Sequence, residues 1–211
     1  MAINEAAPEE AVGAERAPGA EASDQALWDA VSQAIRTRRS NLRIDPERPV
    51  PHDLIERLID LAQWAPNHKQ THPWRFAVVT GAGRERLGAA AAEGFLHQGL
   101  SDPAVLAKTR SKYLRAPVVL VMSSAAHAVP YLHRENRDAV AAGVQNLLLG
   151  ATALGLASYW STGIAAESGP VKALAGLQPE DEIVALVYLG WPAGPAPAGQ
   201  RRPPLVTVID R

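Results

Sequence analysis

Apolar side chains near the start of the chain recur in two stretches at the 3.6-residue period of a helix. The first stretch predicts a helix from Leu27 onward, with Ser23 or Asp24 as the N-cap that accepts hydrogen bonds from free backbone N–H groups. The second predicts a helix that follows residues 49–51 and is stopped by Pro66. The apolar positions are Leu27, Trp28, Val31 and Ile35 in the first helix and Leu54, Ile55, Leu58, Ile59 and Leu61 in the second.

Runs of β-branched and apolar residues, bounded by turn residues, predict three buried strands over residues 75–80, 116–124 and 182–189. Between the first two strands, residues 84–114 are rich in alanine and predict helix with a break near Pro103. This alternation of helices and strands indicates an α/β or α+β class, with helices on both faces of a sheet.

Residues 139–157 carry no charged side chain, which raises the question of a membrane span. Gln145, Asn146 and Thr152 interrupt the apolar run, and three glycines allow close helix packing, so a buried central helix is the better interpretation. A helix that is apolar on every side must be covered on every side. Because one domain rarely covers a helix that completely, we expect a dimer interface to supply the missing cover.

The composition limits the classes of function. With 211 residues, the chain is expected to form one main domain over residues 26–211. The absence of cysteine excludes disulfides, thiolate catalysis and cysteine-ligated metal centres. The six histidines show no metal-binding spacing, so no metal site is predicted.

Charge is distributed unevenly along the chain. Residues 1–25 hold six acidic side chains and one basic one, with almost no large apolar residue, and we expect them to form a disordered acidic tail. They lack the basic start and apolar core of a signal peptide, which favours a cytoplasmic protein with no membrane partner. The remaining chain has 20 basic and 16 acidic side chains, a surplus that suits a small phosphorylated ligand and falls far short of a nucleic-acid surface.

Two basic clusters lie at segment ends. Arg38, Arg39 and Ser40 end the first helix and offer guanidinium and hydroxyl donors matched to a phosphate monoester or to the carbonyl-rich edge of a planar ring. A solvated basic helix end is the alternative. Arg201 and Arg202 follow a Pro- and Gly-rich linker and would ordinarily be surface charges. The last apolar stretch, residues 205–209, is read as a strand that could reach a neighbouring subunit.

Two further segments offer hydrogen-bond donors. The loop after the second helix contains Asn67, His68, Lys69 and Gln70, which taken alone would more often be ordinary loop residues. A later strand ends in Trp160, Ser161, Thr162 and Gly163. Small residues and a glycine at a strand end can bring backbone N–H groups close to a planar ring. A plain turn is the alternative interpretation.

These pieces, in this order, resemble the FMN-dependent nitroreductase family, most closely its short bacterial NAD(P)H nitroreductase branch. The likeness spans residues 27–209 and is carried by residues 38–40, 65–76, 159–163 and 201–205. It implies a homodimer with an α+β (α/β three-layer) fold. In that fold a central antiparallel or mixed sheet is flanked by helices, and the C-terminal tail is exchanged between subunits.

The resemblance also implies that the candidate residues bind FMN. Residues 38–40 would contact the FMN phosphate and the pyrimidine edge, and Arg201 or Arg202 would contact the phosphate. Residues 67–69 would lie against the flavin, often from the other subunit. Residues 160–163 would face the flavin near N5 and O4.

The implied activity is ping-pong hydride transfer through flavin N5, from NADH or NADPH to a nitroaromatic, quinone or similar small-molecule acceptor. No catalytic side chain is predicted, because the flavin carries the chemistry. The alternatives are another flavin reaction on this fold, such as dehydrogenation, dehalogenation or oxygen-dependent flavin chemistry, and a non-catalytic flavin-binding dimer. Trp64 keeps the last alternative open, because the branch tends to carry there an arginine that touches FMN.

Overall fold

The computed structural model describes residues 20–210, and the chain divides into two compact units, residues 1–36 and 37–211. Helix α1 (Ala20–Thr37), except for its last residue, makes up the described part of the first unit. The predicted N-cap at Ser23 or Asp24 is wrong, because the helix-forming residues 20–22 extend the helix and place both residues inside it. Most of the predicted acidic tail, residues 1–19, lies outside the described residues.

A four-stranded antiparallel sheet forms the centre of the second unit, in the order β1-β2-β4-β3. The strands are β1 (Trp74–Thr80), β2 (Val118–Ser124), β3 (Ala157–Ser161) and β4 (Glu182–Gly190). The three predicted strands are confirmed to within two residues. Their register pairs Trp74 with Ser124 and Val118 with Leu189.

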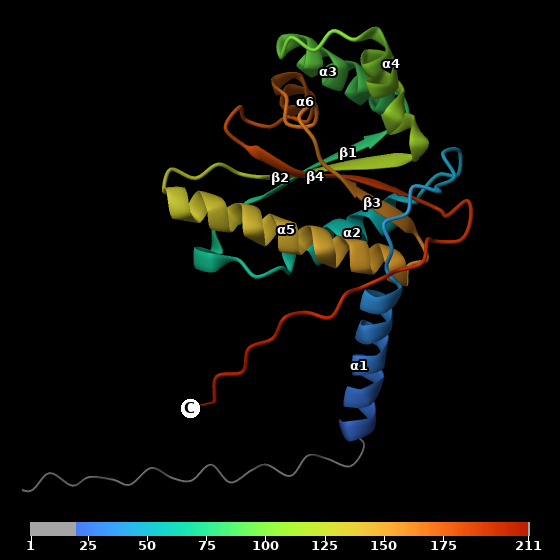
Figure 1. Cartoon of the computed structure of the whole chain (residues 1–211), viewed down its shortest axis with the longest axis vertical. Coiled ribbons are helices and arrows are strands. Elements are labelled where there is room, and N and C mark those ends of the chain that lie inside the picture. Colours follow the sequence, from blue (N-terminus) through green and yellow to red (C-terminus); the bar gives the residue numbers. More distant parts are fainter. Residues whose placement is uncertain (1–19, 211) are drawn as a thin grey trace, which may run out of the picture. The chain divides into compact units, whose positions relative to one another are not determined.

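Helices cover both faces of the sheet, as the sequence predicts (Figure 1). Strand β2 is buried along its whole length, and its alternate residues enter two different cores. Val118, Leu120 and Met122 pack with α2 (His52–Gln63) and α5 (Pro130–Ala153). Val119 and Val121 pack on the other face, which α3 (Gly83–His97), α4 (Pro103–Ser111) and α6 (Gly169–Leu174) cover. The result is a three-layer α+β domain.

The break predicted near Pro103 is confirmed, since α3 and α4 are separate helices and η2 (Lys112–Arg115) follows them. The central helix is placed differently from the prediction of residues 139–157. Helix α5 starts nine residues earlier, with Pro130 in its first turn, and ends at Ala153 before Gly155, which has a φ of +73°. Of the described helices, none is long and apolar enough to cross a membrane.

The end of the chain does not form the predicted strand in the single subunit. Residues 195–210 have no regular secondary structure, and Leu205 and Ile209 are 99% and 86% exposed. A strand needs a neighbouring edge to pair with, because its backbone N–H and C=O groups are otherwise unpaired. Exchange of this tail in a dimer therefore stays a prediction.

Candidate functional site

The basic cluster of residues 38–40 lies beside the start of β3. Ser40 forms a parallel bridge with Ser158, and the Asn41 N–H donates to the Ser158 carbonyl at 2.9 Å. Arg38 and Arg39 are half-buried, and Nη1 of Arg39 donates to the Arg38 carbonyl at 2.8 Å. The segment is therefore fixed to the sheet and is not a frayed helix end.

The C-terminal linker passes directly over this cluster. A Cβ placed on Gly199 would lie 2.5 Å from Cζ of Arg39, so the linker backbone touches the guanidinium. Arg201 and Arg202 follow two and three residues later and are exposed. The fold thus places the linker that leads into Arg201 and Arg202 against Arg39, about 160 residues away in sequence, as a phosphate site shared by both segments would require.

Residues 160–163 end the edge strand β3. The Trp160 indole N–H donates to the Val184 carbonyl at 3.1 Å, which fixes this side chain to β4. Thr162 and Gly163 are exposed, and Gly163 has a φ of +136°, a conformation that favours glycine. The segment is a turn with an accessible backbone. This geometry is compatible with a plain turn and also with backbone N–H groups that face a planar ring.

The loop after α2 has an unusual backbone. It contains the short 3₁₀ helix η1 (His68–Gln70), and Lys69, Gln70 and His72 have φ values of 58°, 50° and 49°. Such left-handed conformations cost non-glycine residues about 1–3 kcal/mol each and concentrate at functional sites. Residues 68–70 are exposed.

Two residues of α5 hold this loop, and sequence analysis missed both. His68 Nδ1 lies 2.7 Å from Oε2 of Glu135, and the Thr71 hydroxyl donates to Oδ1 of the buried Asn136. Asn67 donates to Thr71 Oγ1 at 3.0 Å. The partners are more than 60 positions apart in sequence, so no local pattern indicates them.

The two halves of the predicted site lie toward opposite ends of α5 (Figure 1). The loop contacts Glu135 and Asn136 near its start, whereas residues 38–40 contact the strand that begins just after its last residue, Ala153. The span from Asn136 to Ala153 is about 25 Å at the helical rise per residue. The two halves are therefore well separated within one subunit.

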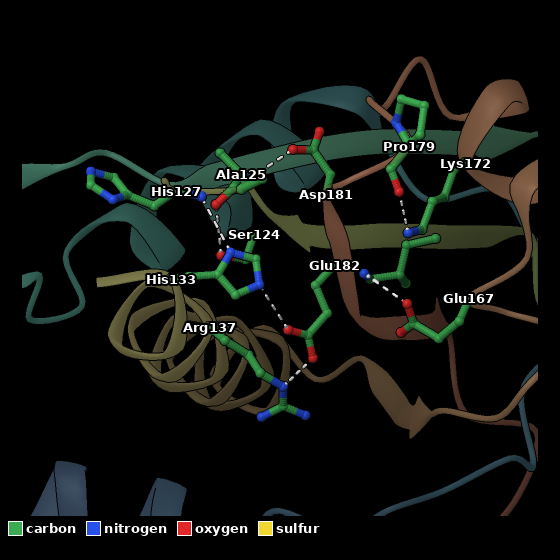
Figure 2. Close-up of polar contacts among 12 residues, drawn as sticks. Ser124, Ala125, His127, His133, Arg137, Glu167, Lys172, Pro179, Asp181 and Glu182 are labelled. Carbon is green, nitrogen blue, oxygen red and sulfur yellow. Dashed lines mark hydrogen bonds and ion pairs between the residues drawn. The ribbon is translucent and has the colours of Figure 1, made fainter. Parts of the chain in front are cut away.

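A second polar cluster lies at the start of β4 (Figure 2). The Glu182 carboxylate pairs with Arg137 and lies 3.9 Å from Nε2 of His133, while Asp181 accepts the backbone N–H groups of residues 126 and 178. Burial raises the pKa of Glu167, whose carboxylate accepts the N–H of residue 183. These contacts join helix α5 and the neighbouring loops to the start of β4. Across residues 20–210 no group of three histidine or acidic side chains could hold a metal ion.

A groove of about 480 Å³ lies between α2 and α5. Leu61 and Gly150 line this groove. The side-chain amide of Asn146, a residue of α5, donates to the Leu61 carbonyl at 3.3 Å and so has a structural partner within the subunit. Trp64 caps the C-terminus of α2 and is 78% exposed. The indole is thus available to a ligand or a second subunit.

Comparisons with known proteins identify the family and the fold. The family model described as "Nitroreductase family" matches residues 35–191. YdjA of Escherichia coli strain K12, a protein named for NAD(P)H nitroreductase activity, is 32% identical over 163 residues, which are 76% of this chain and 87% of YdjA. A nitroreductase-like protein from Bacillus cereus superposes with a TM-score of 0.72 at 27% identity, covering 82% of this chain and 91% of that chain. A nitroreductase with bound FMN from Bacteroides fragilis has the same fold, with a TM-score of 0.68 at 21% identity, covering 85% and 98% of the two chains.

Proposed function

Because this chain belongs to the nitroreductase family, we propose that it is an FMN-dependent NAD(P)H oxidoreductase that reduces nitroaromatic, quinone or similar acceptors. The relative YdjA, matched over 87% of its length, is named as an NAD(P)H nitroreductase. The single observation in this chain that carries the proposal is the contact of Arg39 with the C-terminal linker at Gly199, just before Arg201 and Arg202. FMN would bring a phosphate dianion that needs such a site.

The residues present fit FMN chemically. Arg38, Arg39 and Ser40 would hold the phosphate and the pyrimidine edge, with Arg201 or Arg202 adding charge from the linker. The turn at residues 160–163 offers backbone N–H donors, and its glycine leaves room for a ring to approach. When bound, FMN supplies hydride transfer from NADH or NADPH to the acceptor.

We propose that the complete site forms in a homodimer. The loop of residues 67–69 would come from one subunit and residues 38–40 from its partner, because the loop contacts the start of α5 whereas residues 38–40 contact the strand that follows its end. His68 and Lys69 would then contribute donors and positive charge that favour the reduced flavin. Trp64, next to this loop, would lie at the same interface.

The proposal is tested by FMN binding in the purified protein. We expect a yellow protein with one FMN per subunit. Arg39→Ala should weaken FMN binding about tenfold to a hundredfold, because a charge-assisted hydrogen bond contributes roughly 1.5–3 kcal/mol. Arg38→Ala should act in the same direction. Arg86→Ala, on an exposed position of α3, is the matched control and should bind FMN as the wild type does.

A colourless protein that binds no added FMN would overturn the proposal, and unchanged affinity in both Arg38→Ala and Arg39→Ala would remove this segment from the site. The exposed Trp64 favours one second candidate, a flavin-binding dimer without turnover. Bleaching of the bound flavin by NADH or NADPH, followed by reoxidation with a nitroaromatic, distinguishes the enzyme from this candidate.

A further inference from the structure

We propose that Asn136, a buried residue of α5, is a positioning residue that acts through Thr71 and Asn67 to fix the loop of residues 67–72. The inference rests on the proposed function in one respect, since the loop is taken to present His68 and Lys69 to the flavin. The shape of the loop and its attachment to α5 do not depend on that function.

Hydrogen bonds link the side chains of Asn67, Thr71 and Asn136. The Asn67 side-chain amide donates to Thr71 Oγ1 at 3.0 Å, and the Thr71 hydroxyl donates to Oδ1 of Asn136. Oδ1 of Asn67 accepts the His72 backbone N–H at 2.9 Å, which ties the two ends of the loop together. Linked hydrogen bonds of this kind polarise and strengthen one another.

The hydrogen bonds from Asn67 to Thr71 and from Thr71 to Asn136 form a tether between the loop and α5. The loop needs this tether because it has little apolar packing of its own. None of the three residues of η1 is buried, so no apolar packing fixes them. Lys69, Gln70 and His72 nevertheless keep positive φ values. Without the tether these residues would relax toward the conformations that side chains ordinarily prefer. Asn136 is only 2% exposed, so its carbonyl oxygen is a fixed anchor that water does not easily replace.

His68 and Glu135 form a second, weaker tether. Their side chains are 54% and 42% exposed, so water and salt screen the pair. The neighbouring positions of Glu135 and Asn136 place both anchors on one turn of α5. The buried anchor should therefore fix the loop even in high salt, when the exposed pair is screened.

The tether is tested first by trypsin cleavage after Lys69, which lies within the loop. In the purified full-length protein, Thr71→Val and Asn136→Ala should increase the cleavage rate at Lys69 about tenfold, the effect of losing one typical net hydrogen bond. Thr71→Ser keeps the hydroxyl and should behave as the wild type. Asp102→Ala removes the N-cap of α4 on the far face of the sheet and controls for general destabilisation. Unchanged cleavage in Thr71→Val would overturn the tether even if Asn136→Ala does not fold.

Positioning is tested next by the midpoint potential of bound FMN and its rate of reduction by NADH. Thr71→Val should shift both in the same direction as Lys69→Ala, and the double variant should show little further shift. Thr71→Ser should restore the wild-type potential and reduction rate. Asp102→Ala should leave both values unchanged. If general destabilisation caused the shift in Thr71→Val, Asp102→Ala would shift both values as well. If wild-type protein binds FMN but Thr71→Val and Asn136→Ala keep its potential, the positioning role is wrong and the proposed function stands. If wild-type protein binds no FMN, the proposed function and the positioning role both fall, and cleavage at Lys69 still decides the tether.

Discussion

Lys69 has a backbone φ of 58°, in a region where a Cβ atom crowds the neighbouring carbonyl and where glycine is free of strain. The residue is exposed, so apolar burial does not compensate for the strain. Strain of this kind persists only when surrounding contacts impose it. The contacts that impose it here are those of Asn67 and Thr71, and the side chain kept at this unfavourable position is a cation.

The strain at Lys69 predicts a difference between two substitutions that both remove the charge. Lys69→Gly should give a protein about 1 kcal/mol more stable than Lys69→Ala, because only alanine keeps the Cβ at positive φ. Urea denaturation of the two variants measures the difference. If Lys69→Ala is the more stable variant, as expected at an ordinary right-handed position, the loop does not have this conformation.

Tyr113 is fully buried, and its hydroxyl has no hydrogen-bond partner within the described part of the chain. Its ring stacks on Tyr188 at 6.0 Å between centroids. Burial raises the pKa of Tyr113 far above the usual 10, with a smaller contribution from Tyr188. Burial also raises the pKa of Tyr188 to about 12, and Tyr159 adds to this shift while Arg115 opposes it.

These shifts predict a loss of stability in alkali. The unfolded tyrosines lose their protons near pH 10 while the folded ones keep them, so folding stability is fully present below pH 10 and falls as pH rises toward 12. Tyr113→Phe should reduce the fall by about 1 kcal/mol per pH unit and should be neutral or stabilising at pH 7. Urea denaturation at pH 8 and pH 11 measures both effects, with the exposed Tyr131→Phe as control. If Tyr113→Phe and the wild type lose equal folding stability between pH 8 and pH 11, the raised pKa of Tyr113 is not the cause of the loss.

At the scale of elements, α2 and α5 approach closely because α5 carries glycine where the two helices meet. A Cβ on Gly143 would lie 2.6 Å from the Ala62 carbonyl oxygen, which is backbone. A Cβ on Gly150 would lie 2.6 Å from Cδ1 of Leu61, which is the flexible end of a side chain. The same methyl group therefore meets a rigid neighbour at one position and a movable one at the other.

This contrast predicts unequal effects of two identical substitutions. Gly143→Ala should destabilise the protein by about 1–3 kcal/mol, since the helices must move apart. Gly150→Ala should be nearly neutral, because the gain in helix propensity of about 1 kcal/mol offsets the shift of the leucine. Thermal denaturation of both variants gives the comparison. Equal destabilisation would show that the close contact is not concentrated at Gly143.

The sequence predicted strands better than it predicted the ends of helices, for a physical reason. The strands of residues 118–124 and 182–190 are buried on both faces, so a continuous apolar run marks them from end to end. The start of α5 is amphipathic and charged. The prediction of this helix rested on residues 139–157, which carry no charge, and therefore did not include its start. Arg137 and Asn136 belong to that missed turn, and their partners are 45 and 65 positions away in sequence. The anchors of the candidate site thus depend on tertiary contacts that no local pattern contains.

At the scale of the whole molecule, α5 and the C-terminal tail are two of the apolar surfaces that the single subunit leaves uncovered. The face of α5 that includes Ala142 and Ala153 is exposed, although the helix is apolar over its second half. The tail exposes Leu205, Val206, Val208 and Ile209 at 70% or more. Burying these four side chains in a partner would contribute roughly 6–12 kcal/mol before the cost of ordering the tail. A second subunit that covers both surfaces is the simplest source of that stabilisation, and it would also join the two halves of the candidate site.

Two truncations separate the contribution of the apolar tail from that of the arginines. Ending the chain after Gly194 removes the linker, Arg201, Arg202 and the apolar stretch, and should reduce dimer stability and FMN affinity together. Ending it after Pro203 keeps both arginines, so dimer stability should fall while more of the phosphate contact remains. Light scattering reports the oligomeric state, and FMN fluorescence reports binding. A chain truncated after Gly194 that scatters as a stable, FMN-loaded monomer would contradict both the exchanged tail and the shared site, because neither the apolar stretch nor the second subunit would then be needed.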